Sequence, residues 1–279
     1  MSAGGSADGA AAGAVSSTTL LAAGIVGGLL CIIISGFIPS FKIGSFVVAL
    51  GPAIAAIGAV LAIVWGADAI RRVASYGLGT GVPSIGYMSL SVGVISALVG
   101  ITLASTLKLA IVGPVIALVV AIIIGAIIAI VATKIVGMKI PIMLQCTIEI
   151  AGAACLSVLG FSTAIAGSCA MVPIYQNVVA NGYIAVLFIM CTMAIQHPFN
   201  ACLGPNEDQV RTLKCAASTA FLSMTIVGIL AIVGGSAGWI FVLIIGLIGW
   251  IYSFRAFVQA SCNDAASTKW AGLWPNVEE

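Results

Sequence analysis

The chain has 279 residues, of which 62% are hydrophobic, and only ten basic and eight acidic side chains carry a formal charge. So few charges are too few to cover a water-soluble protein of this size, and a net charge of +2 without a basic stripe argues against a nucleic-acid partner. The charges fall between long apolar stretches, which is typical of an all-α, polytopic integral membrane protein.

The first eighteen residues are mostly Gly, Ala, Ser and Thr and contain no basic side chain. A secretory signal needs a positively charged segment before its apolar core, so this segment is not one. We expect residues 1–18 to form a flexible cytoplasmic tail.

Eight apolar stretches follow, and they predict a bundle of about eight transmembrane helices over residues 19–257, with a cytoplasmic tail at 258–279. The stretches are continuous, whereas the strands of a membrane barrel alternate in polarity. Seven spans is the alternative, because the connections around Lys108 and Gly235 are short enough to be kinks. The predicted helices are Thr19–Ile38, Ser45–Trp65, Tyr87–Leu107, Leu109–Thr133, Ile142–Gly167, Tyr183–Gln196 (or from Val179), Cys215–Gly234 and Trp239–Phe257.

The basic residues predict the orientation of these spans. With eight spans, one side of the membrane holds eight basic residues: Arg71, Arg72, Lys134, Lys139, Arg211, Lys214, Arg255 and Lys269. The other side holds only Lys42 and Lys108. Lys and Arg favour cytoplasmic loops, so both termini are expected in the cytoplasm and the uncharged loop Ser168–Gly182 outside.

Asp68, Arg71 and Arg72 follow Trp65 at the inner end of the second predicted helix. Their spacings of three and four residues allow Asp68 to pair with either arginine on a helix. One interpretation is an interfacial anchor that also sets topology. The other is a loop over Arg71–Ser84 that contacts a partner protein.

Glu149 is the most informative single residue, because it lies well inside the fifth predicted helix. An isolated carboxylate in hydrocarbon is costly, so Glu149 needs a partner, a water-filled cavity or a bound cation. Gln145 shares its helical face, and the two residues are candidate ligands of a sodium path. The alternative is a structural ion pair with Lys139 or Arg72.

The single histidine, His197, precedes Pro198, which is expected to end the sixth helix there. The segment from His197 to Arg211 is then a polar cytoplasmic loop. Its chemistry predicts docking to a partner protein through His197, Asn206, Glu207, Asp208 and Arg211, together with Arg71 and Arg72. One histidine without nearby Cys or His makes a poor metal site, and no catalytic residue is predicted on this chain.

Three segments, Trp65–Met88, Met193–Glu207 and Lys269–Pro275, carry a family resemblance. They include Gln196-His-Pro-Phe-Asn-Ala-Cys-Leu-Gly-Pro-Asn-Glu207 and resemble the subunit designated C of tetrahydromethanopterin S-methyltransferase. The resemblance runs from about the first helix to the C-terminus and leaves out the small-residue tail.

The resemblance implies a multisubunit complex in the cytoplasmic membrane of a methanogenic archaeon. That complex moves a methyl group from methyl-tetrahydromethanopterin to coenzyme M through a protein-bound cobamide, and couples the transfer to sodium export. The cobamide and the methyl-transfer chemistry are then expected on other subunits, with no cofactor on this chain. The resemblance gives no sodium ligands, so Glu149 and Gln145 rest on the residues alone.

Three hypotheses for the chain's role follow. It is a membrane subunit that helps form the sodium path, a structural subunit that binds lipids and packs against the translocating ones, or a self-sufficient secondary cation transporter. A sodium path requires Glu149 to face a hydrated interior, whereas a structural role predicts a closed ion pair. A self-sufficient transporter often has duplicated halves, and no convincing internal repeat is present.

Overall fold

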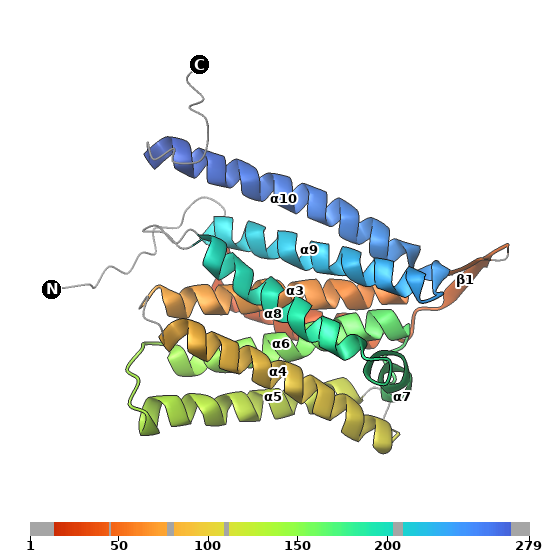
Figure 1. Cartoon of the computed structure of the whole chain (residues 1–279), viewed down its shortest axis with the longest axis horizontal. Helices are drawn as coiled ribbons and strands as arrows, with labels where there is room; N and C mark the ends of the chain where they lie inside the picture. Colours follow the sequence, from red (N-terminus) through yellow and green to blue (C-terminus); the bar gives the residue numbers. More distant parts are fainter. Residues whose placement is uncertain (1–13, 45, 77–80, 109–111, 203–208, 269–279) are drawn as a thin grey trace.

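The computed structural model describes residues 14–44, 46–76, 81–108, 112–202 and 209–268, and it is a bundle of long apolar helices (Figure 1). Within these residues seven helices are long and apolar enough to cross a membrane, or eight if one bent pair counts as a span. The expected all-α membrane fold is therefore confirmed. Whether it has seven or eight spans depends on whether the bent pair is counted as a span.

The first span, Ser17–Ser35, consists of α1 (Ser17–Ala22) and α2 (Gly28–Ser35) joined by a π-helical turn at Ala23–Gly27. The other elements in chain order are β1 (Ser40–Ile43), β2 (Phe46–Ala49), α3 (Gly51–Ala74), α4 (Gly81–Thr106), α5 (Val112–Ile130) with a π-helical turn at Val131–Ile135, α6 (Met143–Ala166), α7 (Met171–Ile174) with a π-helical turn at Tyr175–Val179, α8 (Tyr183–Cys202), α9 (Gln209–Val233), a 3₁₀ turn at Ala237–Trp239 and α10 (Ile240–Thr268).

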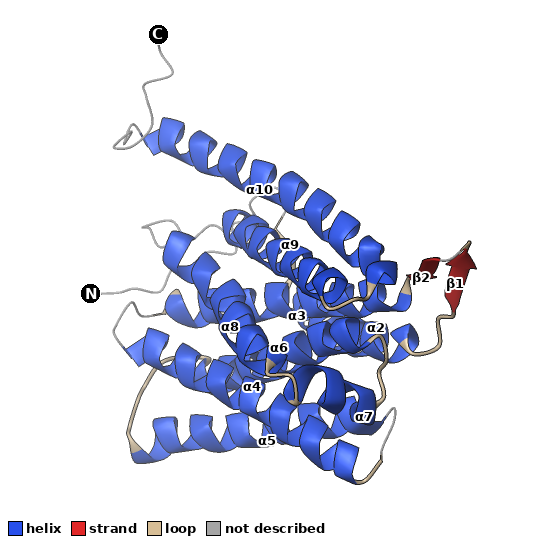
Figure 2. Cartoon of the chain, turned by 45° about the vertical axis from the view of Figure 1, so that its right-hand side comes forward, coloured by secondary structure: helices blue, strands red, loops and turns tan. Residues whose placement is uncertain are grey.

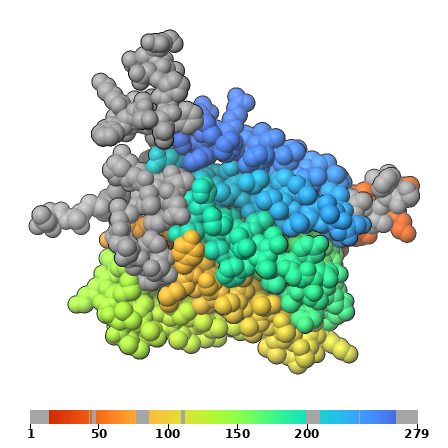
Figure 3. All heavy atoms as spheres, viewed as in Figure 1, coloured from red at the N-terminus to blue at the C-terminus, as the bar shows by residue number. Residues whose placement is uncertain are grey.

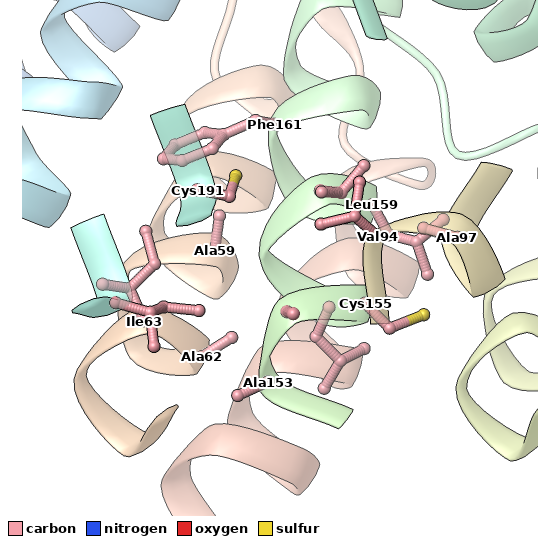
Figure 4. Close-up of a cluster of buried hydrophobic side chains, with 14 of the residues drawn as sticks. Ala59, Ala62, Ile63, Val94, Ala97, Ala153, Cys155, Leu159, Phe161 and Cys191 are labelled. Carbon is pink, nitrogen blue, oxygen red and sulfur yellow. The ribbon is translucent and has the colours of Figure 1, made fainter. Parts of the chain in front are cut away.

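Helix α6 forms the centre of the bundle and packs against α3, α4, α5 and α8. Almost its whole length is buried, which explains why its sequence is rich in Ala, Gly, Ser and Cys rather than in large apolar residues. Figure 4 shows part of this core, where Leu159 and Cys155 of α6 lie on the side of Val94 and Ala97, and Ile63 of α3 lies on the opposite side of α6. The small side chains let the helix axes approach closely.

The two ends of the bundle differ in the basic residues that they carry. Six of the described basic residues belong to one end, here called the basic end: Arg71, Arg72, Lys134, Lys139, Arg211 and Lys214. Lys42 and Lys108 belong to the opposite end, here called the hairpin end. Arg255 lies near the middle of α10, and Lys269 is outside the described residues.

The predicted helix Ser45–Trp65 is wrong at both ends. Residues Ser40–Ala49 form an antiparallel hairpin, in which Ile43 pairs with Phe46, and the helix runs instead over Gly51–Ala74. Aromatic and β-branched residues on both sides of Gly44, whose φ is +63°, favour the hairpin, and Pro52 starts the helix in its first turn. The hairpin projects beyond the packed helices (Figure 3).

The prediction that Pro198 ends the sixth helix is also wrong, because α8 continues to Cys202. Proline has no N–H, so the carbonyl of Ala194 loses its partner within the helix. The Thr219 hydroxyl of α9 donates to that carbonyl at 3.0 Å, which compensates for the missing bond. Ahead of α8, Met171–Val179 is helical and bent by 91° from Tyr183–Pro198, so Ser168–Gly182 is more than a short turn.

Three further helices are longer than predicted. Helix α4 begins at Gly81 rather than Tyr87, α9 begins at Gln209 rather than Cys215, and α10 continues into the predicted tail as far as Thr268. The chain reverses near Lys108 and Gly235, both with positive φ, so neither connection is a kink. Figure 2 shows α10 on the outside of the bundle, where it packs mainly on α9.

A buried ion cluster as the candidate functional site

Four charged residues at the basic end form one buried cluster, here called the ion cluster: Asp68, Arg71 and Arg72 of α3, and Glu149 of α6. Asp68 is fully buried. Its Oδ1 accepts from Nε and Nη2 of Arg71 at 3.1 and 3.0 Å, and its Oδ2 accepts from Nε of Arg72 at 3.0 Å. Both pairings predicted from the helical spacing are therefore present.

Glu149 is 4% exposed and closes the cluster from the side of α6. Its Oε2 accepts from Nη2 of Arg72 and from the indole N–H of Trp65, the latter at 2.9 Å. Its Oε1 accepts from Nε2 of Gln145 at 2.8 Å. Each carboxylate oxygen thus has a donor, and Arg72 links the two helices by binding both acids.

Gln209, the first residue of α9, connects the ion cluster to the segment before α1. Its Nε2 lies 3.2 Å from Oδ1 of Asp68 and 2.8 Å from the carbonyl oxygen of Val15. Its Oε1 accepts from the N–H of Val15 at 3.0 Å. One carboxamide therefore joins α3, α9 and the N-terminal segment.

Close approach of α3 and α6 brings the two acids together, and glycines permit it. A Cβ on Gly66 would lie 2.9 Å from Cβ of Ala153, and one on Gly152 would lie 3.1 Å from the ring of Trp65. A Cβ on Gly24 would lie 2.6 Å from Cε3 of the same indole. Two glycines therefore leave room for the Trp65 side chain, whose N–H donates to Glu149.

The charges of the ion cluster sum to zero, since two carboxylates face two guanidinium groups. Removing ions from water is costly, and their attraction offsets that cost only when the geometry is good and the remaining hydrogen-bonding atoms have partners. Here all four carboxylate oxygens accept hydrogen bonds. Loss of one member leaves an uncompensated charge, so each member depends on the others.

The predicted docking residues differ in how exposed they are in the structure. His197 is exposed on α8, whereas Arg71 and Arg72 face inward with side chains only 17% and 13% exposed. Arg211 lies in the first turn of α9 and is partly buried. Asn206, Glu207 and Asp208 lie outside the described residues.

Glu149 and Gln145, the candidate sodium ligands, do lie together on α6, and Gln145 uses its amide N–H to bind Glu149. The ion pair of Glu149 is made with Arg72, one of the two partners considered from the sequence, and Lys139 is not in it. Among the described residues, no three His, Cys, Asp or Glu side chains gather in a way that could hold a metal ion.

Two members of this site were not predicted, Trp65 and Gln209. The role of Trp65 could have been predicted, because a buried indole N–H needs a hydrogen-bond acceptor and its membrane span contains few polar groups. The role of Gln209 could not have been predicted, because it is 141 positions from Asp68 and their contact depends on how α9 packs.

Comparison with known proteins gives a consistent result along the whole chain. The family model that describes the tetrahydromethanopterin S-methyltransferase subunit designated C matches residues 1–278. A protein of that name from Methanothermobacter marburgensis is 56% identical over 273 residues, covering 98% of each chain. Its namesake from Methanothermobacter thermautotrophicus is 54% identical, covering 98% of each chain. Its namesake from Methanosarcina mazei is 47% identical, covering 100% of this chain and 99% of the relative.

Proposed function

The chain belongs to the family of the tetrahydromethanopterin S-methyltransferase subunit designated C, and on that premise we propose that it is a membrane subunit of a sodium-exporting methyltransferase complex. The complex transfers a methyl group from methyl-tetrahydromethanopterin to coenzyme M by way of a cobamide held on a partner subunit. This chain then supplies part of the membrane domain in a methanogenic archaeon. The long apolar helices and the relatives' names as subunits support this role over that of a stand-alone transporter.

Within that complex, we propose that the ion cluster locks α3 to α6, so that the chain acts as a rigid scaffold. The observation that carries this proposal is the closed pairing of Glu149 with Arg72, Trp65 and Gln145. A closed, neutral pair is what the structural hypothesis expects of Glu149. Lipids and sister subunits are then the partners of the exposed apolar faces.

A second candidate role keeps Glu149 and Gln145 on the sodium path. It is favoured by one feature, namely that a single side chain, Arg72, provides the positive charge between Glu149 and Asp68. If Arg72 moves away, a sodium ion in its place finds oxygen ligands on both acids, and hard cations prefer such ligands. The two roles predict different results for variants that remove Arg72 and Glu149 together.

Purification of the chain from a methanogen tests its membership of the complex. An affinity tag on this chain is expected to retain a corrinoid-containing subunit and methyltransferase activity that requires Na⁺, and reconstituted vesicles should take up Na⁺ during methyl transfer.

A photo-cross-linking residue at Glu207 should join the chain to another subunit if the α8–α9 connection docks. A tagged, unrelated membrane protein is the control, and recovery of this chain alone would overturn the proposal.

We propose that the basic end faces the cytoplasm and the hairpin end the outside. With Lys139 and Lys42 replaced by Cys one at a time, on a background without native cysteines, each variant loses one positive charge and gains one exposed thiol. A membrane-impermeant maleimide is expected to label Lys139→Cys in sealed inverted vesicles and Lys42→Cys in intact cells, because basic loops stay inside. Labelling of Lys139→Cys from outside intact cells would reverse the orientation.

A further inference from the structure

Two buried polar side chains of α8, those of Gln196 and Thr192, have no hydrogen-bond partner among the described residues. They are only 1% and 7% exposed. Neither carboxamide atom of Gln196 nor the hydroxyl oxygen of Thr192 has a partner in the part of the chain that the structure describes. The two residues are one helical turn apart, so they lie on the same face of α8.

Gly86 of α4 lies next to Gln196, and Ile70 of α3 lies next to Gly86. A Cβ built on Gly86 of α4 would lie 3.3 Å from Oε1 of Gln196 and 4.0 Å from Cδ1 of Ile70 of α3. The missing side chain at Gly86 therefore lets the carboxamide approach α4 closely, and a larger residue there would press on Oε1. The nearest described ionisable groups on α3, those of the ion cluster, are already paired with one another.

We propose that Gln196 and Thr192 form a binding site for ordered water between α3, α4 and α8. A buried carboxamide with both its donor and its acceptor free selects a ligand that can donate and accept, and water does both. A bare cation would satisfy Oε1 and the Thr192 oxygen but leave the amide N–H without a partner. An anion would leave Oε1 unsatisfied.

The site is separate from the ion cluster and independent of the function proposed above. Its consequence is that the bundle holds water near its basic end, although most of its core is apolar. Buried water of this kind is a structural component, because it supplies hydrogen bonds that the surrounding helices do not make.

The test uses the whole complex purified in detergent, with the variants Gln196→Leu and Thr192→Val. A high-resolution density map of the unmodified complex is expected to contain a water peak within hydrogen-bonding distance of Gln196 and Thr192, and Gln196→Leu should lose it. Both variants should lower the melting temperature, the leucine variant more, because each removes a hydrogen bond to the bound water. Gln176→Leu, at an exposed position before α8, is the matched control and should leave the melting temperature unchanged.

Two results would overturn the proposal. If the map is empty at this position and Gln196→Leu raises the melting temperature, the carboxamide is dry and unsatisfied. If replacing Na⁺ by choline lowers the melting temperature of the unmodified complex but not that of Gln196→Leu, the occupant is Na⁺ rather than water. Should Gln196→Leu fail to assemble, the map and the milder Thr192→Val still decide between these outcomes.

Discussion

Replacing Glu149 with Gln is expected to destabilise the complex strongly, because it leaves the ion cluster with one excess positive charge. Arg72 keeps its bond to Asp68 but loses the carboxylate on α6. Removing one partner of a buried ion pair costs about 3–5 kcal/mol. The melting temperature of the purified complex and the yield of assembled complex measure the effect.

The double variant Glu149→Gln with Arg72→Gln is expected to recover much of that loss. In it, Asp68 and Arg71 remain and their charges cancel, so no buried charge lacks a partner. Contacting pairs of this kind typically show coupling energies of about 0.5–3 kcal/mol. Lys139→Gln removes the same charge as Arg72→Gln at an exposed position and should have little effect.

The double variant also separates the two roles proposed for Glu149. If the ion cluster is a structural lock, the recovered complex should couple methyl transfer to Na⁺ uptake normally. If Glu149 binds Na⁺, the double variant should assemble but lose that uptake. A double variant no more stable than Glu149→Gln alone would contradict the coupling between the two residues.

Replacing Gly160 with Leu is expected to prevent assembly of this chain by forcing α3 and α6 apart. A Cβ at this position would lie 2.8 Å from the carbonyl oxygen of Ala55 and 2.9 Å from Cβ of Ala59. The first of these atoms belongs to the backbone, which cannot rotate away as a side chain can. Overpacking of a tight core costs about 1–3 kcal/mol and sometimes more, and a leucine here also displaces the helix that carries Asp68.

The effect of Gly160→Leu is measured by the amount of chain recovered in the complex, with Gly160→Ala as an intermediate step. Thr102→Leu, at an exposed position on α4, adds a side chain of the same kind without meeting the core and should assemble normally. Equal recovery of Gly160→Leu and Thr102→Leu would mean that α3 and α6 are not packed as closely as described.

Much of the fold was predictable because membrane spans are local features of composition. The predicted helix Ile142–Gly167 differs from Met143–Ala166 by a single residue at each end. The errors arose where a local rule was overridden. The second strand of the Ser40–Ala49 hairpin lay in the apolar stretch Ser45–Trp65, which also suited a helix. Pro198 was accommodated because Thr219 of another helix donates to the carbonyl that the proline leaves free.

The sequence by itself determined that this is a membrane bundle, that its basic residues lie mostly at one end, and that Asp68 can pair with Arg71 and Arg72. Each of these depends on residues a few positions apart or on composition. Only the tertiary structure decided between the partners of Glu149, because Arg72 and Trp65 are 77 and 84 positions away and reach it only when α3 packs on α6. That packing depends on contacts between small residues of different helices, and the sequence pattern of one helix does not predict which residues it contacts on the other.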